Sequence, residues 1–100
     1  MFTIIWEFDV RPEFWNIYRE EYSANGIWAQ LFRQAKGYRG TTLLIDESTP
    51  HRAVTIDRWE REEDFDEFKK VFADEYHELD KRCEQYTLGE RLIGRFREAL

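Results

Sequence analysis

The sequence is poor in the residues that build disulfides, metal sites and membrane spans. Its 100 residues include one cysteine, Cys83, and two histidines, which excludes an internal disulfide and a thiolate metal cluster. No apolar run approaches membrane-spanning length, and Met1 leads directly into a strand pattern without a basic leader. We therefore expect a cytoplasmic protein with no membrane partner.

Several functional signatures are also missing. The sequence contains no nucleophile–base pair, no glycine-rich phosphate loop and no cluster of metal ligands. These gaps count against hydrolysis, phosphoryl transfer and nucleotide binding, and we expect no metal and no organic cofactor. The net charge of −6 argues against nucleic acid and anionic membranes as main partners.

Aromatic residues, by contrast, are abundant. Eight Phe, five Tyr and four Trp make up 17% of the chain, within a hydrophobic share of 42%. That share is sufficient for a packed core, and we expect residues 1–100 to form one domain. The aromatic excess indicates further buried surface at a pocket or a subunit interface.

The first third of the chain predicts a strand followed by a broken helix. Alternating apolar residues over 2–10 indicate a strand, and Ile5 on its second face suggests that both faces are covered. Pro12 is typical of a helix start. The stretch 23–26 interrupts the helical pattern, and Asn25 is expected to cap a second piece over 27–35. We expect this break to gate a cavity.

The remainder predicts three strands and one long helix. Gly37 suits a left-handed helix end. A helical stripe begins with Phe65 and Phe68 and continues at spacings of three and four to Tyr86. The predicted segments are a strand over 38–46, a hairpin loop over 47–51, a strand over 52–59, a helix from 62, a short helical turn over 87–90 and a strand over 92–96.

This order gives an α+β fold with a four-stranded antiparallel sheet and both helices on one face. We expect Ile5 and Trp59 on the other face, together with alternate residues of the second strand. That face would be too apolar for water. A homodimer formed through sheet-to-sheet packing is the simplest way to cover it.

Five short motifs stand out along the chain: Trp6-Glu7-Phe8 with Pro12, Gly37-Tyr38 with Gly40-Thr41, Asp57-Arg58-Trp59-Glu60, Phe65 with Phe68, and Ile93-Gly94-Arg95-Phe96. On these motifs the chain resembles the antibiotic biosynthesis monooxygenase family, within the dimeric α/β barrels. The resemblance implies a ferredoxin-like βαββαβ subunit that pairs sheet to sheet and keeps a cavity between its helices and its own sheet. Some members oxidise aromatic polyketides with oxygen and no cofactor, some degrade haem, and many have no known activity.

Haem-degrading members combine a first-strand Asn, a third-strand Trp and a helical His. Trp59 matches the Trp position, and His77 lies on the corresponding helix. The Asn is missing, because the first strand offers Glu7 and Asp9 instead. This departure counts against haem degradation.

Three residues are candidates for catalysis, and each has a structural alternative. Trp59 would stack on an aromatic substrate, or else close the strand as a core or interface residue. His77, three residues from both Asp74 and Asp80, would act as a base, or else be a solvated helix residue. Asp57 would be an acid/base group in a cavity, or else an interface ion pair with Arg39.

Four further aromatic residues are candidates for ligand binding: Tyr18, Tyr22, Trp28 and Tyr38. Their hydroxyl and indole groups would line a cavity for an aromatic small molecule. The sequence therefore supports two main hypotheses, a cofactor-independent monooxygenase acting on a small aromatic or quinone-like molecule, and a non-catalytic protein that binds such a molecule in the same pocket.

Overall fold

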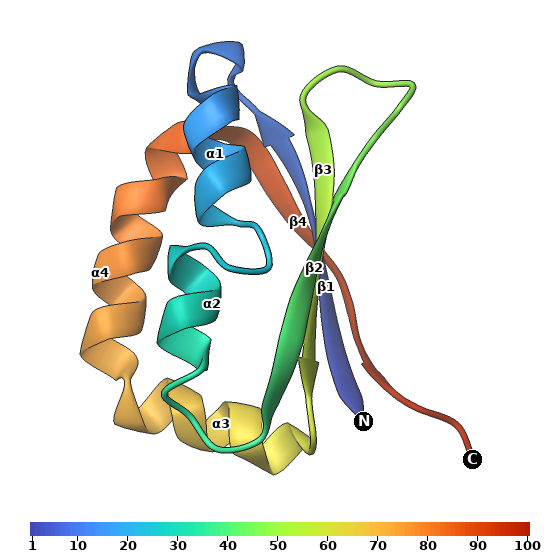
Figure 1. Ribbon diagram of the computed structural model, residues 1–100, viewed down its shortest axis with the longest axis vertical. Helices are drawn as coiled ribbons and strands as arrows, with labels where there is room; N and C mark the ends of the chain where they lie inside the picture. The colour runs from blue at the N-terminus through green and yellow to red at the C-terminus, as the bar shows by residue number, and fades with distance from the viewer.

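The computed structural model describes residues 1–100 as one four-stranded antiparallel sheet with all helices on one side (Figure 1). The strands are β1 (Phe2–Val10), β2 (Tyr38–Ile45), β3 (Arg52–Trp59) and β4 (Thr87–Arg97). The helices are α1 (Trp15–Glu21), α2 (Ile27–Phe32), α3 (Glu62–Val71) and α4 (Ala73–Cys83). None of them is long and apolar enough to cross a membrane.

The strand order β2-β3-β1-β4 confirms the predicted ferredoxin-like βαββαβ fold. β1 lies in the middle of the sheet, between β3 and β4, as its two partly apolar faces predicted. Phe2, Ile4, Phe8 and Val10 are buried against the helices. Ile5 lies on the open face, opposite Ile56 of β3.

The predicted break in the first helix is confirmed. A 3-10 turn at Pro12–Phe14 leads into α1, and the chain then turns before α2 begins at Ile27. The predicted role of Asn25 is wrong, because Gly26 occupies the N-cap position and the Asn25 side chain accepts a hydrogen bond from Arg33 instead. A Cβ at Gly26 would collide with the Glu21 carbonyl oxygen, so the close approach of the two backbone segments requires glycine here.

The second helical segment differs from the prediction in two places. Its apolar stripe packs on the core as expected, but the helix is divided at Phe72 into α3 and α4, which run in different directions (Figure 1). The short helical turn lies at Glu84–Tyr86 rather than over 87–90, and β4 begins directly at Thr87. The predicted turn over 87–90 is wrong, because these residues pair with the central strand β1 instead.

Trp59 lies on the helix side of the sheet, and its predicted place on the open face is wrong. Its side chain is 0% exposed within the single chain. Phe32 meets it edge to face with ring centroids 5.6 Å apart, and Phe68 lies at 5.5 Å. Because side chains alternate along β3, Thr55 and Asp57 lie on the same side as Trp59, toward the helices.

The open face of the sheet nevertheless keeps an apolar centre. Ile5, Val54 and Ile56 are partly buried there, whereas Leu44 is 48% and Phe96 is 46% exposed. The face also carries charges, since Arg52 and Arg91 both form ion pairs with Glu7.

Candidate functional site

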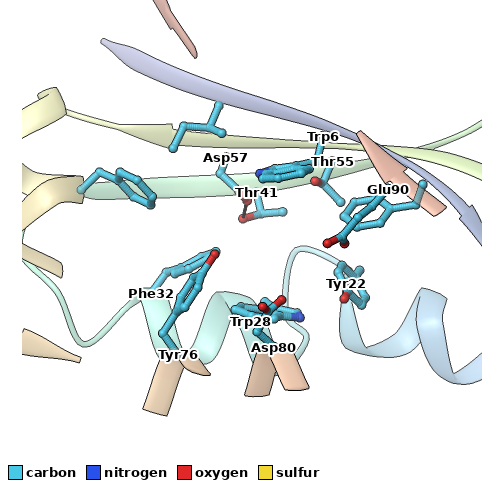
Figure 2. A pocket seen from close by; sticks show the side chains of 13 residues that line it. Trp6, Tyr22, Trp28, Phe32, Thr41, Thr55, Asp57, Tyr76, Asp80 and Glu90 are labelled. Atoms are coloured by element: carbon cyan, nitrogen blue, oxygen red, sulfur yellow. Dashed lines mark hydrogen bonds between the residues drawn. The ribbon is translucent and has the colours of Figure 1, made fainter. Parts of the chain in front are cut away.

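A pocket of about 130 Å³ lies between the helices and the sheet (Figure 2). Its lining is mostly aromatic and aliphatic, with hydroxyl and carboxylate groups among the apolar side chains. The lining residues are Ile4, Trp6, Phe8, Tyr22, Trp28, Phe32, Thr41, Thr55, Asp57, Phe65, Tyr76, Asp80 and Glu90. They come from all four strands and from both helical segments, so the pocket depends on the whole fold.

Asp57 projects from β3 into this pocket and is held by a short chain of hydroxyl groups. Thr41 lies opposite it on β2, and the Thr41 Oγ1 donates a 2.6 Å hydrogen bond to the Asp57 Oδ1. Because that bond uses the Thr41 hydrogen, the Tyr38 hydroxyl donates to the Thr41 Oγ1, also over 2.6 Å. The second carboxylate oxygen, Oδ2, has no donor within the protein.

The expected pair of Asp57 with Arg39 does not form. Arg39 bonds Glu60 over 2.7 Å, on the exposed surface. The error follows from the wrong side of the sheet, since Asp57 points toward the helices and not toward a partner sheet. A mid-strand acid on this side must find a neutral donor, and the neighbouring strand supplies Thr41.

Burial raises the pKa of the Asp57 carboxyl from 3.8 to about 6, against the opposing effects of the Thr41 hydrogen bond and the Arg58 charge. The apolar surroundings penalise the charged form, and no cation lines the pocket to offset this penalty. A carboxyl group with this pKa is mainly ionised at neutral pH, and it becomes protonated when the pH falls below about 6. It is therefore suited to accept a proton from a bound molecule.

Aromatic rings form most of the pocket wall, and they support one another. The Tyr22 ring stacks on the Tyr18 ring at 4.3 Å, and Trp28 meets Tyr76 edge to face at 5.4 Å. Burial raises the pKa of both Tyr18 and Tyr22 strongly, and it raises the pKa of Tyr76 to about 12. All three hydroxyl groups are thus neutral at physiological pH.

A family model described as antibiotic biosynthesis monooxygenase matches residues 1–79. The chain belongs to this family. The family resemblance in the sequence is thereby confirmed over residues 1–79, which include β1, β2 and β3, whereas β4 lies outside the matched range. No functionally curated protein matched the chain.

Solved structures of similar fold cover nearly the whole chain. SnoaB, a cofactor-independent oxygenase from Streptomyces nogalater, is 17% identical with a TM-score of 0.73, over 99% of this chain and 93% of its own. A candidate antibiotic biosynthesis monooxygenase from Deinococcus radiodurans is 13% identical with a TM-score of 0.78, over 100% and 94%. Another from Nitrosomonas europaea is 13% identical with a TM-score of 0.71, over 100% of both chains. At these identities the likeness shows the shared fold.

Within this family member, the structure brings together only some of the predicted site residues. Asp57, Tyr22 and Trp28 line the pocket, and Tyr38 reaches it through Thr41. Tyr18 lies behind Tyr22 with 0% exposure. Trp59 is enclosed in the core and is not part of the lining.

His77 stands apart from the pocket of this monooxygenase-family chain. It is exposed on α4 and touches only the edge of the Tyr76 ring, with centroids 5.9 Å apart. It forms no ion pair or hydrogen bond with its neighbours Asp74 and Asp80, so neither carboxylate orients the imidazole as a base would require.

Sequence reasoning missed several lining residues. Trp6 shares a face with Ile4 and Phe8, and this alternation was a usable signal. Glu90 was hidden by the predicted helical turn, because only its place on β4 opposite Phe8 turns it toward the helices. Tyr76 and Asp80 are four residues apart on α4 and both border the pocket.

Proposed function

We propose that this protein is a cofactor-independent monooxygenase that oxidises a small phenolic or quinone-forming molecule with molecular oxygen. The observation that carries the proposal is Asp57, an ionisable carboxylate with a free oxygen in an aromatic-lined pocket. Family membership and the structural likeness to SnoaB support this class of reaction. The ligand's ring would rest between the sheet and the helices, among Trp6, Tyr22 and Trp28.

In this proposal Asp57 is the general base. Its Oδ2 accepts the proton of the bound phenol, while the hydroxyl chain from Tyr38 through Thr41 keeps the carboxylate in place. The resulting phenolate is electron-rich and reacts with oxygen at the ring carbon. The protein contributes by orienting the ring and by excluding water, which are positional effects.

The reaction balances without an external reductant. A phenol with a free para position and one O2 give a quinone and one water, so one oxygen atom enters the ring carbonyl and the other leaves as water. The substrate itself supplies all the electrons, through loss of its O–H and C–H hydrogens. We assign no step to Trp59 or His77, because one is enclosed in the core and the other lies outside the pocket.

We also propose that the working form is a homodimer joined through the open sheet faces. The support is the apolar centre of that face, where Leu44 and Phe96 remain about half exposed in the single chain. Exposed apolar side chains of this kind are typical of subunit interfaces.

The test is oxygen uptake with a panel of para-unsubstituted phenols, followed together with quinone absorbance. We expect oxygen consumption that depends on the protein, and Asp57→Asn should reduce the rate by about 10²- to 10⁴-fold, as expected for the loss of a general base. Tyr18→Phe is the matched control, since its hydroxyl has no partner and lies outside the pocket. Equal rates for Asp57→Asn and the unmodified protein would contradict the proposed mechanism.

A second candidate function is ligand binding without catalysis. It is favoured by one observation: no Lys, Arg or His lines the pocket, so no cationic group is present to stabilise a phenolate. Binding of phenols without any oxygen uptake would establish this alternative. We do not propose haem binding, because a 130 Å³ cavity is far smaller than the 300–1,000 Å³ or so that is usual for cofactor-sized ligands.

A further inference from the structure

We propose that the pocket selects one-ring aromatic ligands that carry a protonated amine and rejects those that carry a carboxylate. The inference rests on the proposed function, in that it assumes the pocket to be a ligand site, and it deepens that function by naming the ligand class. It is carried by the size of the pocket and by the sign of every charge in its lining.

Size limits the ligand to a single ring. The volume of about 130 Å³ is close to that of cavities which hold one benzene molecule, roughly 150 Å³. Trp6 lies on the sheet side of the pocket and Trp28 on the helix side (Figure 2). Phe8 of β1 also belongs to the lining. A larger polycyclic body would have to displace these side chains, several of which are buried and packed on one another.

Every charged residue in the lining is an acid. Asp57 projects from β3, Asp80 from α4 and Glu90 from β4, so the three carboxylates reach the pocket from separate elements (Figure 2). Neither Asp80 nor Glu90 takes part in an ion pair or a side-chain hydrogen bond. Both residues are exposed, so their carboxylates border the pocket at its solvent side.

No basic side chain in the lining offsets these charges. Burial raises the pKa of Glu90, and the charges of Asp80 and Glu84 raise it further. The carboxylates of Asp80, Glu90 and Asp57 all add to the elevated pKa of the Tyr76 hydroxyl. The pocket therefore holds a negative potential that a bound cation would relieve.

The arrangement accommodates both ends of a phenolic amine. The phenol hydroxyl would donate to the Asp57 Oδ2, which has no other donor, and the ammonium group would lie toward the carboxylates of Asp80 and Glu90. The aromatic faces add a favourable interaction with a nearby cation. A ligand carboxylate in the same place would meet two like charges and no basic partner.

Three one-ring probes of similar size test this selectivity: tyramine, 4-ethylphenol and 3-(4-hydroxyphenyl)propionate, which are cationic, neutral and anionic. Affinity is measured by calorimetry and tryptophan quenching at pH 7.5 in low salt. We expect tyramine to bind about tenfold more tightly than 4-ethylphenol, and the propionate to bind about tenfold more weakly. The tyramine advantage should shrink at high salt, because these carboxylates are partly screened.

The variant Asp80→Asn/Glu90→Gln should remove the preference for tyramine, so that tyramine and 4-ethylphenol bind with similar affinities. Asp74→Asn is the matched control, since it removes an acid from the same helix outside the lining and should keep the preference. If 4-ethylphenol binds and the three probes have equal affinities, the selectivity is refuted, whereas the pocket remains supported as a ligand site. If neither 4-ethylphenol nor unsubstituted phenol binds a folded protein, the proposed function fails as well.

Discussion

Thr41 and Asp57 face each other across β2 and β3 and share a 2.6 Å hydrogen bond on the helix side of the sheet. This one pairing fixes the orientation of the pocket's most perturbed acid. It also connects the acid to Tyr38, whose hydroxyl lies 2.6 Å from the Thr41 Oγ1. The site thus depends on strand register, which the hydrophobic pattern and the turn between the strands determine.

The first prediction concerns this hydrogen bond. Thr41→Val removes a donor that stabilises the ionised carboxylate, so the pKa of Asp57 should rise above its present value of about 6. The acid limb of the rate profile, or the carboxyl resonance followed by NMR, should move to higher pH. Thr3→Val, on the open face of β1 and outside the pocket lining, is the control and should leave the titration unchanged. An unshifted Asp57 titration in Thr41→Val would contradict the assigned bond.

The second prediction links Asp57 to stability. Its pKa is about 6 in the folded chain against an ordinary value of 3.8, so the folded state binds more protons between these pH values. The contribution of Asp57 to the free energy of unfolding should therefore be largest below about pH 4. It should fall as the pH rises through 6. Raising the pKa from 3.8 to about 6 corresponds to a loss of roughly 3 kcal/mol at pH 8.

Asp57→Asn should remove this dependence and keep an acceptor for Thr41. In urea unfolding the variant should exceed the unmodified protein by up to about 3 kcal/mol at pH 8 and by much less at pH 4. A difference of equal size at both pH values would show that the substitution acts through packing rather than through the charge.

Strand and helix positions were predictable from sequence because they follow from local periodicity. The bounds of β1 and β3 and the break before Ile27 match the prediction, and Gly37 has the expected positive φ of 86°. The side of the sheet that each strand face occupies was not predictable in the same way. β3 has apolar residues on both faces, and only the packing of Trp59 against the helices distinguishes them.

The candidate site was predictable only where aromatic residues lay on an identified helix face, as with Tyr22 and Trp28. Its polar members depend on tertiary pairing. Thr41 becomes a site residue because the β2–β3 register sets it opposite Asp57. Glu90 becomes one because β4 starts at Thr87, five residues before the predicted strand over 92–96. Neither relationship is visible in spacing along the chain.

The third prediction tests the core position of Trp59. Trp59→Ala should destabilise the fold by about 3–5 kcal/mol, because the side chain is fully buried among Phe32, Phe65 and Phe68. Trp59→Phe should cost less, since the indole Nε1 has no hydrogen-bond partner to lose. Both values come from chemical denaturation. A melting temperature that does not change in Trp59→Ala would mean that this packing is not realised in solution.

The fourth prediction concerns the proposed dimer. Light scattering at micromolar concentration should give twice the mass of the 12.3 kDa chain. Ile5→Glu places a charge opposite Ile56 at the apolar centre of the open face and should yield monomers. Ile17→Glu, at an exposed apolar position on α1 away from the sheet, should remain dimeric. A monomer at all concentrations for the unmodified protein would rule out the sheet-to-sheet assembly.

The last prediction is that the break between α1 and α2 gates the pocket. Tyr22 lines the pocket and is the C-cap residue of α1, so a movement of the segment 23–26 would shift a wall of the site. Short helices of seven and six residues, without side-chain caps, favour local opening here. Amides of residues 23–27 should exchange faster than those of β1 and should slow when a bound phenol holds Tyr22 in place.

Gly26→Ala provides the complementary test of this gate. A Cβ at this position would meet the carbonyl oxygens of Glu20 and Glu21, so the connection between the two helices must shift. We expect faster exchange in the segment and altered association rates for the ligand, with the sheet amides unaffected. If the amides of residues 23–27 exchange as slowly as those of the central strands, in the unmodified protein and in Gly26→Ala, the proposed gate is contradicted.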